Sequence, residues 1–265
     1  MRSKLINLLA NQAVNYNQKW LIQFNTIDST NNYATKMVED GLAHHGKVIW
    51  ALQQTNGRGQ RGKPWITNEN ENIMMSLILQ GEKLGNTHPI HLNMLIANTL
   101  CRYFQQIIPN VNIAIKWPND IYFNDKKTVG ILIENIFRGN KWNSAIIGLG
   151  INVNQTDYGI LLPNAGSLAY FAKKQFELFP IISDLRAGIL NEFQQFQPEQ
   201  FDQLLEHYND NLFGRNQWRT FINRSTQESF EGKVLKVNAN GMLLIETKKG
   251  IQEFGNGEIE WIINK

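Results

Sequence analysis

The chain has 265 residues, of which 42% are hydrophobic and 18% are charged. These values are typical of a globular protein with one large domain or with a larger and a smaller one, and they exclude disordered and fibrous classes. The net charge of +3, from 26 basic and 23 acidic residues, is too small to indicate nucleic-acid binding through bulk electrostatics. Any preference for an anionic ligand must therefore arise locally.

Membrane and secretion signals are missing from the sequence. No apolar run reaches the ~18 residues of a membrane span, and the segment MRSKLINLLANQ (1–12) lacks the apolar core and cleavage site of a signal peptide. We therefore expect a cytoplasmic protein with no membrane partner. The single cysteine, Cys101, excludes an internal disulfide and a multi-cysteine zinc site. The helical apolar spacing around it predicts a buried packing thiol.

In chain order, the expected elements begin with a helix after IDSTNN, where Asp28 or Ser29 can cap the first N–H groups. Helical patterns return from about 165 to 208, and short strands joined by N-A-N-G follow. This order predicts an α+β fold with a mixed or antiparallel sheet packed with helices over 1–214, and a small C-terminal β-barrel domain over 215–265. Apolar segments predict the strands of the larger sheet at 48–52, 73–79, 113–117, 129–137 and 144–153.

The segment QQTNGRGQRGKPW (53–65) fits the spacing of two phosphate-binding motifs, G-x-G-x-x-G and G-x-x-x-x-G-K. A P-loop needs Ser or Thr after Lys63, but Pro64 follows, and both motifs need a helix that begins at the loop. Here the chain leads into the strand predicted at 73–79. Neither a P-loop nor a dinucleotide-binding turn is therefore predicted.

Three segments remain as candidate parts of a site. The loop carries three cations and three glycines, which attract anions and permit close backbone approach, although a solvated connection between strands has the same composition. KWPNDIYFNDKKTVGILIE (116–134) gathers lysine, asparagine and aspartate side chains around a turn between two strands. GLGINVN (148–154) places two glycines in an apolar strand, which indicates either close approach of another backbone or a ligand, or a β-bulge.

Together with IDSTNN (27–32), these segments resemble the biotin protein ligases. The marks of that family are D-S-T-N, a GRGRRGR-x-W loop, a K-W-P-N-D…K-x-x-G-I-L-x-E block and a G-I-G-I-N-V-N strand, and all four occur here in this order. FEGKV…GMLLIE…GEIEW also resembles the family's small β-barrel domain. The resemblance implies the class II synthetase-like fold of the biotin and lipoate ligases. Because fewer than thirty residues precede D-S-T-N, it implies the short, monofunctional type with no DNA partner.

The resemblance also implies the reaction. Such enzymes activate biotin with ATP and Mg²⁺ to biotinyl-5′-AMP, and then transfer biotin to a lysine of the biotin carboxyl carrier domain of a biotin-dependent carboxylase. The first step brings two anions together, so fixed cations and backbone donors are the main catalytic need. A lipoate or octanoate ligase and a non-catalytic biotin sensor remain as alternatives. Exposed sheet edges could also pair two subunits into a homodimer.

Residue roles follow only from the resemblance. Ser29, Thr30 and Gln54 are expected to bind the ureido ring of biotin. Arg58, with the backbone near Gly57, is expected to face the biotin carboxylate and the adenylate phosphate.

Lys127 is expected to be the leading catalytic residue, stabilising charge beside the forming acyl phosphate with the help of Arg58. Gly130, three residues later, is assigned to the biotin site. Gln60 stands where the family loop carries arginine, so we expect the adenylate to be held less tightly. No metal ligand is firmly assigned, although Mg²⁺ is expected near the nucleotide and Asp120. The residues expected to bind ATP or the adenylate are Arg58, Arg61, Lys63, Trp65, Asn119, Asp120 and Asn152.

Overall fold

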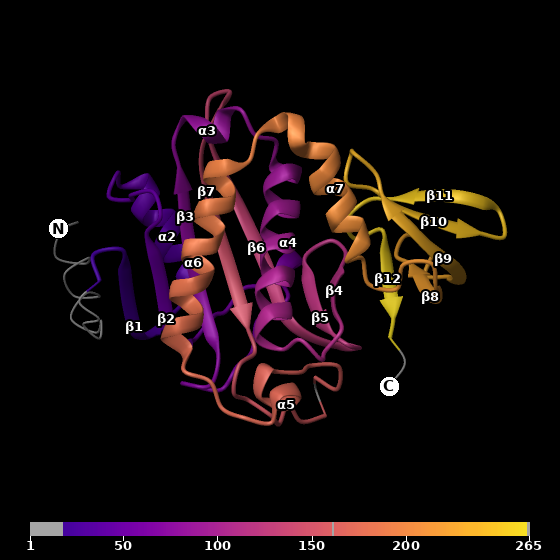
Figure 1. Ribbon diagram of the computed structural model, residues 1–265, viewed down its shortest axis with the longest axis horizontal. Helices are drawn as coiled ribbons and strands as arrows, with labels where there is room; N and C mark the ends of the chain where they lie inside the picture. Colours follow the sequence, from indigo (N-terminus) through magenta and orange to yellow (C-terminus); the bar gives the residue numbers. More distant parts are fainter. Residues whose placement is uncertain (1–17, 161, 264–265) are drawn as a thin grey trace. The chain divides into compact units, whose positions relative to one another are not determined.

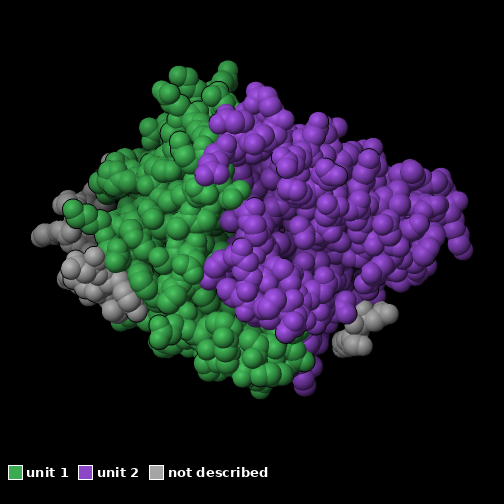
Figure 2. Space-filling view, viewed as in Figure 1, with its two compact units in different colours: residues 1–88, 128–157, 166–194 green, residues 89–127, 158–165, 195–265 purple. Residues whose placement is uncertain are grey.

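The computed structural model describes residues 18–160 and 162–263. The segment 1–12, in which a signal peptide was sought, lies outside these residues. The chain divides into two compact units: residues up to 88 with 128–157 and 166–194, and residues 89–127 with 158–165 and 195–265 (Figure 2). Within the described ranges, no helix is long and apolar enough to cross a membrane.

The first unit is built on a mixed sheet with the strand order β1-β2-β3-β7-β6 (Figure 1). β1 and β2 are parallel, and the other neighbours are antiparallel. All residues of the IMMSLIL stretch of β3 are buried, as expected for a continuous apolar run. The strand bounds are β1 Leu21–Ile27, β2 Val48–Gln54, β3 Ile73–Gln80, β6 Lys126–Arg138 and β7 Lys141–Ile151.

Helix α2 (Thr30–Glu39) packs on one face of this sheet, where its buried side chains form a core cluster with β1, β2, β3 and β7. Ser29 is its N-cap, with Oγ accepting from the N–H of Asn32 at 3.5 Å. The predicted start of this helix is therefore confirmed. The other helices of the first unit are α3 (Glu82–Gly85), α5 (Leu168–Ala172) and α6 (Leu178–Gln195).

The second unit combines two helices, a hairpin and a separate antiparallel sheet of strand order β11-β10-β9-β8-β12. Cys101 lies on α4, and burial raises the pKa of its thiol to about 12, which confirms its prediction as a packing residue. The elements of this unit are α4 (Pro89–Ile107), β4 (Ile113–Lys116), β5 (Asp120–Phe123), α7 (Phe201–Asp210), β8 (Trp218–Asn223), β9 (Ser229–Val237), β10 (Leu243–Thr247), β11 (Gly250–Phe254) and β12 (Ile259–Ile262).

The predicted fold class is confirmed: a mixed sheet is packed with helices, and an antiparallel sheet follows at the C-terminal end. Closure of this second sheet into a barrel stays a prediction. The boundary at 214/215 stays a prediction. One local expectation needs revision, because 116–134 contains two turns rather than one. The chain reverses after Lys116, forms the short strand β5, and reverses again at Asn124, whose φ of 50° lies in the left-handed region.

Candidate functional site

One face of β7 organises the candidate site in the first unit. Ile146, Gly148 and Gly150 alternate along the strand and therefore point to the same face. Ile146 packs in the cluster that holds α2. A Cβ at Gly148 would collide with the side chain of Asn31, and one at Gly150 would collide with the ring of Trp65. These glycines are therefore closely approached, but by the side chains of Asn31 and Trp65 rather than by the backbone or ligand that the sequence predicted.

A polar cluster lies where α2 begins on this face. The backbone N–H and Oγ1 of Thr30 lie 2.8 and 3.2 Å from Gln54 Oε1, so Thr30 donates to the end of β2. Ser76 Oγ, on β3, lies 2.8 Å from Thr30 Oγ1 and 2.5 Å from Asn31 Oδ1. Ser29, Thr30 and Ser76 are all buried. The structure thus brings together Ser29, Thr30 and Gln54, the three side chains expected to bind the ureido ring.

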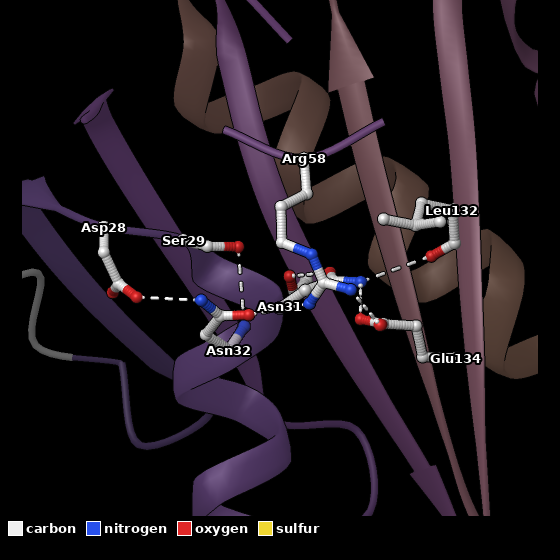
Figure 3. A network of polar contacts seen from close by, with 8 residues as sticks. Asp28, Ser29, Asn31, Asn32, Arg58, Leu132 and Glu134 are labelled. Carbon is white, nitrogen blue, oxygen red and sulfur yellow. Dashed lines mark hydrogen bonds and ion pairs between the residues drawn. The ribbon is translucent and has the colours of Figure 1, made fainter. Parts of the chain in front are cut away.

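Arg58 extends this cluster from the loop (Figure 3). Its Nη1 donates to Asn32 Oδ1 at 2.7 Å, and its Nη2 donates to Glu134 Oε1, also at 2.7 Å. The second carboxylate oxygen of Glu134 accepts from Asn31 Nδ2 at 2.7 Å. A cation is therefore held at one end of the polar cluster by groups from α2 and β6.

The loop folds back across the sheet through Trp65. Its N–H donates to the carbonyl of Gly57 at 2.9 Å, and Arg58 and Pro64 form an antiparallel bridge. The indole ring lies against Gly130 as well as Gly150, where a side chain on either glycine would collide with it. These glycines are paired across β6 and β7. Gly57, Arg58, Trp65 and Gly130 are therefore assembled in one place.

The tip of the loop is a short 3-10 turn at Gln60–Gly62. Arg61 adopts a left-handed conformation with a φ of 58°, and both Arg61 and Lys63 are exposed. Gly59 N–H donates to Lys63 O at 2.7 Å, which closes the turn. The expected contact of these two cations with the nucleotide stays a prediction.

The second candidate cation, Lys127, stands in the second unit at the start of β6. Its Nζ lies 2.7 Å from Asp120 Oδ1 on β5. Among the described residues that oxygen has no donor in good hydrogen-bond geometry, so the contact is an ion pair. Burial and the Asp120 carboxylate raise the pKa of Tyr122, which keeps this phenol neutral beside the pair. Asn119 immediately precedes Asp120 and is partly buried.

Asn152 occupies a buried position just after β7 in the first unit. Its N–H donates to Thr128 O at 2.9 Å, and its carbonyl accepts from Leu168 N at 3.1 Å. No cluster of three or more His, Cys, Asp or Glu side chains that could hold a metal occurs in the described part of the chain. A single carboxylate such as Asp120 still suits Mg²⁺, which binds proteins through one or two carboxylates and otherwise through substrate phosphates.

Four residues of this hydrogen-bonded cluster were not singled out from the sequence: Asn31, Asn32, Ser76 and Glu134. Two of them, Ser76 and Glu134, carried a recognisable signal. Ser76 is the one polar residue in IMMSLIL, and Glu134 is the one acid in VGILIENIF. A polar group inside an apolar strand needs a partner when it is buried, and here the partner of both is Asn31.

The sequence of this chain is similar to those of several known proteins. Residues 23–152 match the biotin/lipoate A/B protein ligase family. The bifunctional ligase/repressor BirA of Bacillus subtilis is 30% identical over 243 residues, which cover 91% of this chain and 73% of that protein. The biotin-[acetyl-CoA-carboxylase] ligase of Paracoccus denitrificans is 33% identical over 140 residues, covering 52% of this chain and 57% of the other.

The fold has close counterparts among solved structures. Biotin protein ligase from Aquifex aeolicus, in complex with biotin and ATP, aligns with a TM-score of 0.76 at 23% identity, covering 93% of this chain and all of that one. The Leishmania major enzyme in complex with biotinyl-5-AMP aligns with a TM-score of 0.62 at 18% identity, covering 90% and 99% of the two chains. These likenesses show the fold, and the sequence match to the Bacillus subtilis protein shows that the chain belongs to the biotin protein ligase family.

Proposed function

We propose that this chain is an ATP-dependent biotin protein ligase. It joins the carboxylate of biotin to the α-phosphate of ATP, releases pyrophosphate, and transfers the biotinyl group from biotinyl-5′-AMP to a lysine of a carrier domain. Membership of the family supports this activity. The structural observation that carries it is the cation Arg58, held at the end of a buried polar cluster that contains Thr30 and Gln54.

Biotin has a polar ureido head, an apolar body and an anionic tail, and the first unit offers a matching series of groups. Ser29, Thr30 and Gln54 supply donors and acceptors for the head. The surface at Gly130 is proposed for the body, and the indole of Trp65, which lies over this glycine, is proposed to contact the adenylate. Arg58 and the backbone near Gly57 meet the carboxylate and then the adenylate phosphate, because a guanidinium recognises planar anions through two donors.

Lys127 is the second catalytic cation in the proposal. Its charge stabilises the negative charge that builds up on oxygen as the acyl phosphate forms. Asp120 positions this ammonium group, since the two form an ion pair. Asn119, Asn152, Arg61 and Lys63 contribute to nucleotide binding. Mg²⁺ arrives with the phosphates of ATP, and Asp120 is the carboxylate proposed to lie near it.

The acceptor is proposed to be the biotin carboxyl carrier domain of a carboxylase, as the name of the Paracoccus denitrificans relative indicates for that protein. The proposed location is the cytoplasm, where ATP and such carboxylases are available. The small domain at 215–265 is proposed as a separate folding region. The expectations that operator DNA is not bound and that sheet edges pair two subunits remain predictions.

The proposal is tested by the first half-reaction alone. The purified protein is incubated with ATP and Mg²⁺, with and without biotin, while pyrophosphate is measured and the protein fraction is examined for biotinyl-5′-AMP. Pyrophosphate release that depends on biotin, together with the adenylate, is expected. Binding of biotin without pyrophosphate release would identify a sensor instead.

A matched pair of variants links the activity to the site. Arg58→Gln removes the proposed catalytic cation, and Arg224→Gln removes another partly exposed arginine, which pairs with Glu260 at 2.8 Å in the C-terminal sheet. We expect Arg58→Gln to lower kcat/KM for biotin on the order of 100-fold, and Arg224→Gln to leave it unchanged. Equal effects of the two substitutions would remove Arg58 from the mechanism.

A further inference from the structure

We infer that Glu134 is the positioning residue for Arg58 and fixes its guanidinium before any ligand binds. This inference rests on the proposed function, in which Arg58 meets the anionic groups of the substrates. Glu134 lies on β6, 76 positions along the chain from Arg58, and the two are joined at 2.7 Å. It belongs to none of the groups assigned to biotin, to nucleotide or to metal.

The two carboxylate oxygens of Glu134 accept from different residues, one on helix α2 and one in the loop. Oε2 accepts from Asn31 Nδ2, and Oε1 accepts from Arg58 Nη2. Asn31 is buried and is wedged against Gly148, where no Cβ would fit. Its own oxygen lies in hydrogen-bond range of Ser76. Because Asn31 fixes the position of the Glu134 carboxylate, Glu134 in turn orients the side chain of Arg58.

The other terminal nitrogen of the Arg58 guanidinium is also hydrogen-bonded (Figure 3). Nη1 donates to Asn32 Oδ1, and Asn32 Nδ2 donates to Asp28 Oδ2 at 2.8 Å. A guanidinium is planar and has five N–H donors, so these two contacts fix its plane and leave donors for an anion. The entropy of ordering a long arginine side chain is then lost before substrate binds, which is the basis of preorganisation.

The pair contributes little to the stability of the fold. The side chain of Arg58 is 43% exposed and that of Glu134 is 28% exposed, and exposed ion pairs have small effects on unfolding because water screens them. Glu134→Gln is nearly isosteric and retains an oxygen for Asn31. This variant should therefore fold normally, and its effect should appear in the loop and in the chemistry.

The first test needs no substrate. Trypsin can cleave the loop after Arg58 and Arg61, whereas the bond after Lys63 is protected by Pro64. Cleavage by limited trypsin in the absence of ligand should be about three- to tenfold faster in Glu134→Gln, because loss of a charge-assisted bond raises the open population of the loop. Glu260→Gln, which removes the acceptor of the Arg224 pair, is the matched control and should cleave at the wild-type rate.

The second test is a double-mutant cycle on biotin-dependent pyrophosphate release. Glu134→Gln should lower kcat/KM for biotin about tenfold, the scale of one charge-assisted hydrogen bond. In the Arg58→Gln background the same substitution should have no further effect, since Glu134 acts only through Arg58. A purely structural role would lower the rate equally in both backgrounds, so additive effects would overturn the inference.

The outcomes separate the inference from the proposed function. If the wild type releases no pyrophosphate, the proposed function fails, while the trypsin test still reports on the placement of Arg58. If the wild type is active but Glu134→Gln matches it in both tests, the inference fails alone. Asn32→Ala, which removes the other acceptor of Arg58, serves as a positive control for the trypsin test and should also speed cleavage.

Discussion

The two candidate catalytic cations are both ion-paired at 2.7 Å, but they are held in different ways. Arg58 comes from a loop, and its partners Asn32 and Glu134 lie 26 and 76 positions away in the chain. Lys127 pairs with Asp120, only seven positions before it, within two consecutive strands. Its side chain is also less exposed, at 34% against 43%.

The two charges therefore depend on different parts of the fold. The Lys127 pair needs only the turn between β5 and β6, so it persists whenever this hairpin is formed. The orientation of Arg58 depends on the packing of α2 on the sheet, on the pairing of β6 with β7, and on closure of the loop through Trp65. We therefore expect Lys127 to be insensitive to distant changes and Arg58 to be sensitive to them.

The largest expected effect comes from removing the local cation. Lys127→Met should lower the rate of biotinyl-5′-AMP formation on the order of 100- to 1,000-fold, because it removes one of the two positive charges proposed at the reacting oxygens. Lys126→Met is the matched control, since the neighbouring side chain on a strand points to the other face and Lys126 donates to Pro163 O. Single-turnover rates measure both; a loss below tenfold in Lys127→Met would contradict its role.

The next effect concerns the partner of that cation. Asp120→Asn should lower the same rate about tenfold, because an amide orients an ammonium group less firmly than a carboxylate does. If Asp120 acts only by positioning, the substitution adds nothing in the Lys127→Met background.

The dependence on Mg²⁺ checks the other role proposed for Asp120. A metal ligand lost in Asp120→Asn would raise the Mg²⁺ concentration required for half-maximal rate. We expect this concentration to increase less than about threefold, because Asp120 is proposed to lie near Mg²⁺ without binding it directly. A larger increase that persists without Lys127 would make Asp120 a metal ligand rather than a positioning residue.

A smaller effect is expected at the tip of the loop. Gln60→Arg adds a charge where an amide now stands, and it should slow dissociation of biotinyl-5′-AMP about three- to tenfold through one additional exposed charge-assisted contact. The off-rate is measured by chasing labelled adenylate with unlabelled ligand. An unchanged off-rate, or a slow off-rate in the wild type itself, would show that Gln60 does not weaken retention.

The smallest effect is on stability and concerns only the first unit. Partial burial lowers the pKa of His45, and its Nδ1 accepts from Gln80 N–H at 3.1 Å. Because the folded pKa is the lower one, the unfolded chain binds this proton first, and stability falls as pH decreases below about 6.5. His45→Gln should flatten the decrease in melting temperature below that pH, whereas His44→Gln should not. Parallel profiles for all three proteins would contradict this account.

Local patterns in the sequence predict most of the fold. The strands 48–52, 73–79, 129–137 and 144–153 are apolar runs and appear as β2, β3, β6 and β7. The short strand β5 was missed because D-I-Y-F is brief and follows the turn residues of W-P-N. β1 was missed as well, since LIQFNTI mixes polar and apolar residues.

The residues of the candidate site also differ in whether the sequence could predict them. Thr30, Gln54, Arg58 and Lys127 could be named because contiguous motifs carry them. Glu134 and Ser76 could not be assigned partners from the sequence, because their contacts depend on the register of β3, β6 and β7 and on the position at which α2 begins. Register is fixed by packing over the whole sheet rather than by local sequence.

The most direct test of the central claim is transfer to a carrier. The protein is incubated with ATP, Mg²⁺, the carrier domain of an acyl-CoA carboxylase and an equimolar mixture of biotin and lipoate, and the intact mass of the carrier is then measured. We expect the carrier to gain one biotinyl group, and a carrier whose acceptor lysine is replaced by arginine to gain none. A lipoyl group on the carrier, or no transfer at all, would contradict it.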